Sequence, residues 1–457
     1  LRPARADSVL IRSPVEFALF KMFQPSVFAV MVALLLPGVF PKQLQCTMEP
    51  DGSCSLIGSK VTADEILSTS FGSNPKVNTV QFSRSSLSAI PPALLQSFPD
   101  LEVLNGSASD IKQVFSRNFA SGKKLRELYL RGNKIHELPE EAFFGPSRLR
   151  TLDLSSNSIA SADGTVFKRL RELKTLLLGE NELSEMHPLL FDDLTELESL
   201  HLQQNKLRAI GDRQFAGCTS LTHLNVSHNA IKTFHLPQFE RRWLVDLIDA
   251  SYNALTTVSI PSNLRQLVAT GNSIRKVGRS GPDGIQAALI LLKLPHNKLD
   301  SVDSLPMFEK LISLDLSYNQ IRAFDFQSIA KFEKLILLKL DGNQLDTVSN
   351  SLAQSITNLK YVHLADNHFV QLDLDVLRKV PRVIKLDLRR NQLERLSVTD
   401  LSGSFPVMVR LMLEGNRLRC EDSRKLLKEL KSSVTAYAMT REDCAKDQNL
   451  IDGICCS

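Results

Sequence analysis

The sequence of 457 residues lacks a marked excess of either charge, and it lacks the short motifs of common enzymes. Its 55 basic and 50 acidic side chains give a formal net charge of only +5, and no basic patch interleaved with aromatic residues occurs. A nucleic-acid partner is therefore not expected. No H-E-x-x-H, G-x-S-x-G or phosphate-loop pattern is present, so we expect neither catalysis nor a bound cofactor.

Apolar runs long enough to cross a membrane are also missing. The longest run near the N-terminus, Val27–Leu36, has ten residues, which is too short for a span but fits the core of a signal peptide. Met22 precedes it and is a candidate start, because the chain begins with Leu1. We expect residues 1–40 to be an N-terminal extension with a signal peptide and the protein to be secreted; an N-terminal anchor is the alternative.

What the sequence does contain is an asparagine that recurs every 24 residues. Six copies follow at this spacing: Asn133, Asn157, Asn181, Asn205, Asn229 and Asn253. Each stands in the frame L-x-x-L-x-L-x-x-N-x-L, whose alternating part predicts a strand and whose asparagine predicts a turn bonded through its amide. One repeat cannot bury its own leucines, so the copies must stack. The frame is that of a leucine-rich repeat, which predicts an α/β solenoid shaped as a horseshoe with a parallel concave sheet.

The same asparagine continues toward the C-terminus at slightly uneven spacing. The later copies are Asn272, Asn297, Asn319, Asn343, Asn367, Asn391 and Asn416. Ser85 and Ser109 fill this place in two weaker copies at the start, which gives roughly 15 coils. We therefore predict an N-terminal cap over 41–76, the solenoid over 77–418 and a C-terminal cysteine-rich cap over 419–457.

A phenylalanine also recurs every 24 residues and predicts a stacked aromatic spine on the convex side. Its copies are Phe119, Phe143, Phe167, Phe191, Phe215 and Phe239. Only 19 residues separate Asn253 from Asn272, so we expect an extended convex segment there and the end of the spine. The next coil holds Gly278, Gly281 and Gly284, which predict a loop. Later convex segments, such as 327–334 and 375–380, are expected to be more helical.

Cysteines cluster at both ends of the repeats, which predicts disulfide-bonded caps in a secreted protein. The end cysteines are Cys46, Cys54, Cys420, Cys444, Cys455 and Cys456. Cys46 and Cys54 form the natural first pair. The last four allow three connectivities; adjacent cysteines rarely bond to each other, so one of the doublet could reach another chain. Cys218 is expected to be a buried thiol, and no cysteine or histidine spacing predicts zinc.

The residues between the strand leucines face the concave side, which such folds use for partners. Asn105 and Asn225 stand there in N-x-S sequons, five coils apart. Glycans on both would obstruct the N-terminal half of this surface. We therefore expect protein contacts at the C-terminal cap or on the later coils. The candidate partner-binding residues are Lys293, Asp315, Lys339, His363 and Asp387.

A signal peptide, 24-residue leucine-rich coils, then Cys420, Cys444 and the Cys455–Cys456 doublet together resemble the leucine-rich immune molecules of mosquitoes. The resemblance implies a secreted innate immune factor that pairs with a related chain through a disulfide and binds a complement-like thioester protein. It makes Cys455 or Cys456 the candidate interchain cysteine. It also implies a short capping helix over 422–430, with its leucines, Leu426, Leu427 and Leu430, turned inward.

The family usually continues into a coiled coil, and this chain shows no heptads. A different class of binding protein therefore stays open: the ectodomain of a cell-surface adhesion protein or receptor, truncated before its membrane anchor. Leucine-rich ectodomains have the same caps and repeats. The residues that follow in the full-length protein would separate the two hypotheses, since an apolar stretch of about 20 residues would indicate a receptor.

Overall fold

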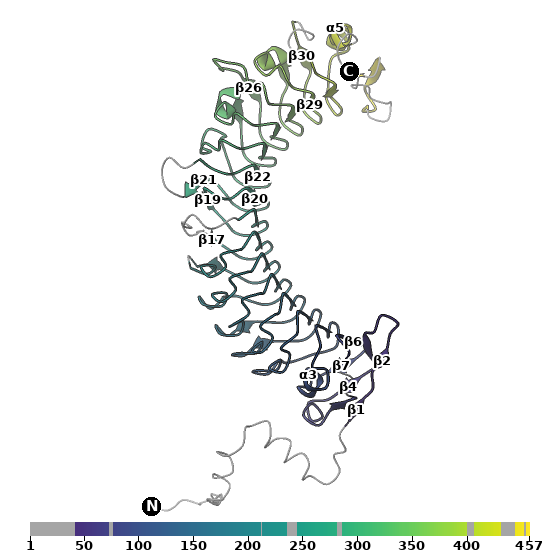
Figure 1. The fold of residues 1–457 in the computed structure, drawn as a ribbon. Helices are drawn as coiled ribbons and strands as arrows, with labels where there is room; N and C mark the ends of the chain where they lie inside the picture. Colours follow the sequence, from purple (N-terminus) through teal and green to yellow (C-terminus); the bar gives the residue numbers. More distant parts are fainter. Residues whose placement is uncertain are drawn as a thin grey trace, which may run out of the picture.

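The computed structural model is a curved solenoid whose coils stack along an arc between two caps (Figure 1). The predicted leucine-rich repeat horseshoe is confirmed. The predicted signal peptide within residues 1–40 lies outside the described part of the chain. The structure describes residues 42–72, 76–211, 213–234, 245–280, 286–399, 406–430, 444–451 and 454–457.

The concave side of the arc is one sheet built from the strands that the repeat frame predicts. Each strand pairs in parallel with that of the next coil, so that residues one period apart, such as Leu128 and Leu152, lie side by side. β2 (Thr47–Met48) adds an antiparallel strand at the N-terminal edge. The parallel strands are β3 (Cys54–Ile57), β6 (Thr79–Ser83), β8 (Val103–Asn105), β9 (Glu127–Tyr129), β11 (Thr151–Asp153), β13 (Thr175–Leu177), β14 (Ser199–His201), β16 (His223–Asn225), β18 (Leu247–Asp249), β20 (Gln266–Val268), β22 (Leu291–Lys293), β23 (Ser313–Asp315), β25 (Leu337–Lys339), β27 (Tyr361–His363), β29 (Lys385–Asp387) and β31 (Arg410–Met412).

The repeated asparagines connect each coil to the one before it. Asn181 is an example: its Nδ2 donates to the carbonyl oxygens of Leu154 at 3.0 Å and Leu178 at 3.1 Å. Its Oδ1 accepts from the N–H of Ile159 at 3.0 Å. These bonds satisfy backbone groups that stacking removes from water, which is why a side chain that can form them recurs from coil to coil. In the first weak copy, the Ser85 hydroxyl bonds to the preceding coil in its place.

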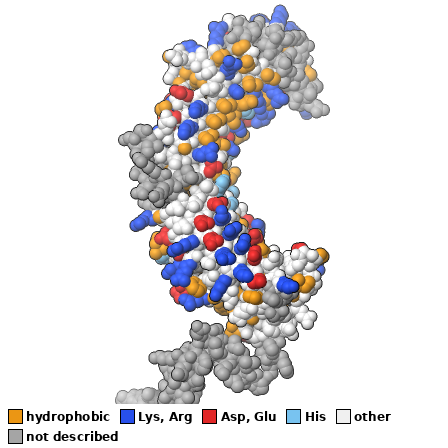
Figure 2. Space-filling model, viewed as in Figure 1, with side chains coloured by type: hydrophobic (Ala, Val, Ile, Leu, Met, Phe, Trp, Pro, Cys, Tyr) orange, Lys and Arg blue, Asp and Glu red, His pale blue; other side chains and the backbone are white. Residues whose placement is uncertain are grey.

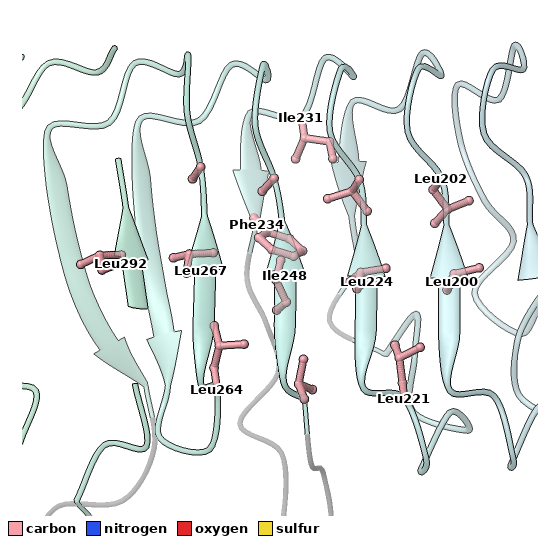
Figure 3. Close-up of a cluster of buried hydrophobic side chains, with 14 of the residues drawn as sticks. Leu200, Leu202, Leu221, Leu224, Ile231, Phe234, Ile248, Leu264, Leu267 and Leu292 are labelled. Atoms are coloured by element: carbon pink, nitrogen blue, oxygen red, sulfur yellow. The ribbon is translucent and has the colours of Figure 1, made fainter. Parts of the chain in front are cut away.

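The strand leucines form one continuous core along the molecule. Figure 3 shows a row in which equivalent side chains of successive strands lie next to one another. The row consists of Leu200, Leu224, Ile248, Leu267 and Leu292, and all of them are buried. Burial of each such side chain stabilises the fold by about 1.5–3 kcal/mol, so the core grows with every coil that is added.

The predicted phenylalanine spine stacks on the convex side. Successive rings from Phe119 to Phe215 are nearly parallel, with centroids 5.4 to 6.3 Å apart. Phe239, the next expected member, lies outside the described residues. The prediction that the spine ends at the short coil is wrong, because Phe308 and Phe332 stack again at 6.4 Å after the break. The 24-residue spacing between these two rings restores the same contact.

The short coil is extended on its convex side, as predicted. β19 (Thr257–Pro261) follows Asn253 and pairs in parallel over its whole length with β21 (Lys276–Ser280). The loop predicted around Gly278 is therefore wrong for 276–280, since the extended short coil supplies a full edge for a second strand. Gly281 and Gly284 lie outside the described residues.

Other coils carry short strand pairs or single helical turns on their outer side. The predicted helical character of the later convex segments is confirmed only as two 3-10 turns. These elements are β1 (Gln43–Leu44) with β5 (Ser70–Phe71), β4 (Lys60–Val61) with β7 (Ser86–Leu87), β10 (Glu137–Leu138) with β12 (Ser161–Ala162), β15 (Ala209–Ile210) with β17 (Thr233–Phe234), β24 (Ala323–Asp325) with β26 (Thr347–Ser349), β28 (Gln371–Asp373) with β30 (Arg395–Ser397), α3 (Ala93–Ser97), η1 (Phe326–Ile329) and η2 (Leu374–Leu377).

Disulfides close both ends of the sheet. Cys46 is joined to Cys54 across the β2–β3 hairpin, with Cα atoms 5.4 Å apart. At the other end, α5 (Cys420–Leu430) begins directly after the last coil. Its Leu426 and Leu427 side chains are buried, as expected, while the Leu430 side chain lies outside the described part.

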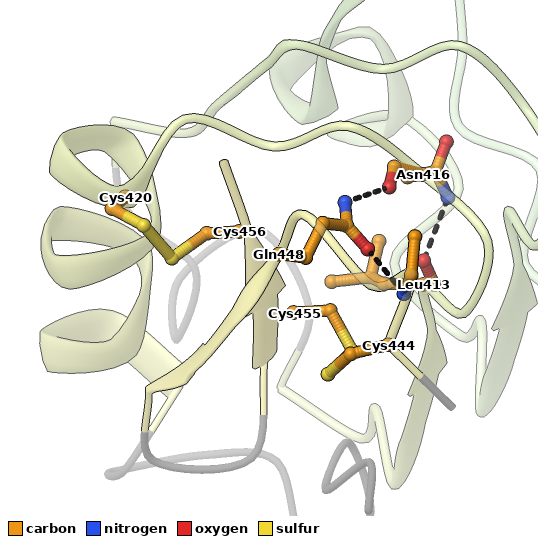
Figure 4. The surroundings of a disulfide bond; sticks show 8 residues. Leu413, Asn416, Cys420, Cys444, Gln448, Cys455 and Cys456 are labelled. Atoms are coloured by element: carbon orange, nitrogen blue, oxygen red, sulfur yellow. Dashed lines mark hydrogen bonds between the residues drawn. A yellow bond between two sulfur atoms is a disulfide. The ribbon is translucent and has the colours of Figure 1, made fainter. Parts of the chain in front are cut away.

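Both cysteines of the C-terminal doublet, Cys455 and Cys456, form disulfide bonds within this chain (Figure 4). Cys456, in the antiparallel pair of β32 (Asn449–Ile451) and β33 (Ile454–Cys456), is bonded to Cys420. Cys455 is bonded to Cys444. The expectation that Cys455 or Cys456 bridges to a second chain is therefore wrong for this structure. The cause is the hairpin, which turns the two neighbouring cysteines to opposite faces, one toward each partner.

Candidate functional site

The concave sheet is the surface on which the candidate binding residues lie. Because side chains alternate along a strand, the middle residue of each strand enters the core and its two neighbours face the concave side. β27 shows this pattern: Val362 is fully buried between the more accessible Tyr361 and His363. The concave surface is therefore made of columns that cross neighbouring coils.

All five candidate partner-binding residues lie in one column. The backbone register places them on successive neighbouring strands, in the order Lys293, Asp315, Lys339, His363 and Asp387. Neighbouring parallel strands lie about 4.8 Å apart, so the column carries groups of both charges along roughly 20 Å. We call these five residues the charged column.

His363 is the centre of a compact cluster in this column. Its Nδ1 lies 3.8 Å from an Oδ2 of Asp387 and 3.9 Å from that of Asp341. Asp387 is nearly inaccessible, and Arg389 donates to both of its oxygens, through Nε at 2.9 Å and Nη2 at 2.7 Å. Lys339 Nζ lies 3.7 Å from Asp315. Each buried acid thus has a cation or imidazole beside it.

Burial shifts the proton affinities of this cluster. Burial, together with the nearby Asp387 and Asp315, raises the pKa of Asp341 to about 6, although the Ala365 N–H that it accepts opposes the shift. For Asp387 burial acts in the same direction, but the Arg389 bonds outweigh it and its pKa is lowered. Burial also lowers the pKa of His363, and Lys385 adds to this effect.

The sequence-based prediction missed two members of the cluster. Asp341 and Arg389 stand two residues after Lys339 and Asp387, just beyond the strand ends. The alternation of side chains along the strand could have identified both residues, because the residue after the last core leucine of the frame still faces the concave side. Lys293, at the other end of the column, forms no ion pair with any described residue.

The two sequon asparagines lie on the same sheet, on β8 and β16. The strand order β8, β9, β11, β13, β14, β16 separates them by five steps. Asn225 Oδ1 accepts from the Ser227 hydroxyl at 2.8 Å, and Asn105 Oδ1 accepts from the Ser107 N–H at 3.0 Å. Both side chains are partly exposed, so a glycan on either would project over the concave face.

The site contains no recognisable centre for metal chemistry in the part that the structure describes. No group of three His, Cys, Asp or Glu side chains there is arranged to hold a metal ion. Likewise, no described helix has both the length and the apolar composition that a membrane crossing requires.

The fold and this face define a leucine-rich repeat protein, and comparisons with known proteins agree. The leucine rich repeat family matches residues 106–159, 147–207 and 195–255. The crystal structure of the LRIM1/APL1C complex is similar over 92% of this chain and 71% of that chain, with a TM-score of 0.68 and 25% identity. The structure of the APL1 leucine-rich repeat domain is similar over 91% of this chain and 99% of that chain, with a TM-score of 0.66 and 25% identity.

Through these two structures the chain is similar, more specifically, to leucine-rich repeat proteins of mosquito immunity. A curated relative also matches: leucine-rich repeat-containing G-protein coupled receptor 5 of Rattus norvegicus is 27% identical over 156 residues. That match covers 34% of this chain and 14% of the receptor.

Proposed function

We propose that this chain is a secreted, non-enzymatic binding protein of innate immunity that holds a protein partner on the charged column. The observation that carries the proposal is the cluster around His363, where charges of both signs are fixed on the concave face of the later coils. Fixed charges in a concave surface favour a partner of complementary pattern and exclude others by leaving their charges unpaired.

The likeness to the LRIM1/APL1C complex supports a further part of the proposal, namely pairing with a related leucine-rich repeat chain. Such pairing would not use the end cysteines of this chain, since all six are bonded within it. A complement-like thioester protein is the partner that the resemblance favours for the concave face. Glycans at Asn105 and Asn225 would cover the earlier coils and leave the concave face of the later coils accessible to this partner.

The test replaces the two lysines of the column, Lys293→Ala with Lys339→Ala. We expect binding of a purified complement-like thioester protein, measured by surface plasmon resonance, to weaken at least about tenfold, because each lysine is an accessible charge within the proposed contact. Lys168→Ala, an exposed lysine beside the phenylalanine spine, is the matched control and should bind like the unaltered chain. Equal binding by the double variant would contradict the assignment to the charged column.

A second candidate function, the ectodomain of a cell-surface receptor, is favoured by the likeness of 156 residues to a leucine-rich repeat receptor. The full-length transcript distinguishes the two. An apolar stretch of about 20 residues downstream of Ser457 would favour the receptor. Recovery of the protein from the culture medium, with no such stretch, would favour the secreted immune factor.

A further inference from the structure

The flank of the later coils carries a row of isoleucines that the repeat does not require. The row is formed by the residue directly before five of the last six concave strands, and it is named here the apolar flank: Ile290, Ile312, Ile336, Ile384 and Val409. Backbone hydrogen bonds join the row from coil to coil. The N–H of Ile312 donates to the carbonyl of Ile290, and that of Ile336 donates to the carbonyl of Ile312, both at 2.8 Å.

The same backbone position is charged in the earlier coils, apart from one threonine. There it holds Glu102, Arg126, Arg150, Lys174, Glu198, Thr222, Asp246 and Arg265. Neighbours in this earlier stretch form ion pairs, as Lys174 and Glu198 do at 2.6 Å. The position therefore tolerates charge, and the leucine-rich fold does not demand an apolar side chain there. Figure 2 shows a corresponding change on the face in view, with blue and red alternating over the earlier coils and orange mixed with blue over the later ones.

The apolar flank is accessible to a partner. Ile312 is 37% exposed and Val409 is 42% exposed, and Tyr361, the first residue of β27, adds a ring that is 38% exposed. The other three members of the row, Ile290, Ile336 and Ile384, are partly exposed. Five apolar side chains in one register on six successive coils extend over about 24 Å at one strand spacing per coil. An exposed apolar row of this kind, interrupted only by Lys360, is typical of an interaction site.

Cations surround this row. The fourth of the six coils has Lys360 in the row itself, and exposed basic residues stand beside the row on neighbouring positions: Lys310, Lys334, Arg382 and Arg410. None of these five forms an ion pair with another described residue. An apolar row with accessible cations on both sides fits a partner that presents apolar side chains between acidic ones.

We propose that the apolar flank docks an amphipathic α-helix with acidic flanks, contributed by a partner protein and lying along the solenoid axis. The coil spacing of about 4.8 Å is close to the 5.4 Å pitch of a helix, so each helical turn can place one apolar side chain against each coil. A helix of about 16 residues covers the row. A second copy of this chain fits poorly, because flank-to-flank contact in a symmetric dimer would bring the two sets of cations together.

The test uses the whole chain and a synthetic helical peptide of about 16 residues with leucines on one face and glutamates beside them. The variant is Ile312→Glu with Ile336→Glu, which the fold should accept because Glu102 and Glu198 occupy the same backbone position. We expect fluorescence anisotropy to show binding by the unaltered chain and at least about tenfold weaker binding by the variant, with an unchanged melting temperature. Arg126→Glu, in the same row of an earlier coil, is the matched control and should bind normally.

Two comparisons complete the experiment. A peptide with lysines in place of the glutamates should bind at least about tenfold more weakly than the acidic peptide. Equal affinity for both peptides, or equal affinity of the variant and the unaltered chain, would overturn the proposal. Absence of peptide binding together with concentration-dependent dimerisation that the Ile312→Glu and Ile336→Glu changes abolish would also overturn it, because the occupant would then be a second copy. The charged column is unaltered in these variants, so the outcome is independent of the proposed function.

Discussion

Asp341 is a single residue whose charge is opposed by its surroundings on the concave face. In the unfolded chain an aspartate titrates near pH 3.9, whereas burial and the neighbouring Asp387 raise the pKa of Asp341 to about 6 in the fold. Well below about pH 4 the group is protonated in both states and costs nothing. As the pH rises from about 4 to about 6, the carboxyl group of Asp341 loses its proton first in the unfolded state. The folded state therefore becomes relatively less stable over this pH range.

Asp341→Asn should therefore stabilise the protein at pH 7.5 by about 2–3 kcal/mol and have little effect at pH 4. The asparagine removes the buried charge, and its side-chain oxygen can still accept from the Ala365 N–H, as Asp341 does at 2.9 Å. Chemical denaturation at both pH values measures the difference. Asp346→Asn changes an exposed acid nearby and should show no such dependence. Destabilisation by Asp341→Asn at pH 7.5 would mean that Lys339 and His363 make the charge favourable.

At the scale of elements, the C-terminal cap is a set of short segments that could not fold alone. β33 returns to the end of the solenoid, where the N–H of Ser457 donates to the Leu418 carbonyl at 2.9 Å. Gln448 donates to the carbonyl of Asn416 at 2.6 Å and so covers the last member of the asparagine ladder (Figure 4). These bonds replace those that a following coil would have supplied, which is what the end of a repeat array needs.

Removing the outer cap disulfide with Cys420→Ser and Cys456→Ser should loosen this end alone. The bond closes a loop of 36 residues, and loss of such a closure costs about 3–4 kcal/mol in the chain-entropy model. Hydrogen exchange should become faster in β31 and α5 and stay unchanged in β9 to β14, because a solenoid unfolds locally from its ends. Cys46→Ser with Cys54→Ser at the other end is the control and should leave β31 protected. Unchanged exchange at β31 in the first variant would show that backbone bonds suffice to close the cap.

At the scale of the whole molecule, the cysteines decide how the chain can associate. Six form three bonds within the chain. The seventh, Cys218, is a buried thiol as predicted, and burial followed by the nearby Asp192 raises its pKa to about 12. A thiol without thiolate character is a poor nucleophile for disulfide exchange. Partners of this solenoid are therefore expected to associate through surfaces such as the charged column and the apolar flank.

Residues 1–457 should run as a monomer on a non-reducing gel. Thiol titration with Ellman's reagent should detect no reactive thiol in the native protein and one after denaturation in guanidinium, since only Cys218 is unbonded. Cys218→Ser is the control and should show none in either condition. A dimer band that disappears on reduction would contradict the intrachain pairing of Cys455 and Cys456.

Much of the candidate site could be predicted because a repeat converts sequence spacing into spatial neighbours. Lys339, His363 and Asp387 stand 24 residues apart and therefore lie on adjacent strands. Asp341 and Arg389 were missed because they lie just beyond the strand ends, where the alternation was not followed. The apolar flank was missed because a single isoleucine before a strand resembles core, and only the stacked coils show that it remains exposed.

The sequence by itself determined the solenoid, its parallel concave sheet and the asparagine ladder, because each depends on a short frame repeated at a fixed period. The tertiary structure alone decided the pairing of Cys420 with Cys456 and of Cys444 with Cys455. It also decided which charges meet around His363. The physical reason is that the caps do not repeat, so their contacts depend on how the chain closes in space, and a buried charge depends on neighbours from several coils at once.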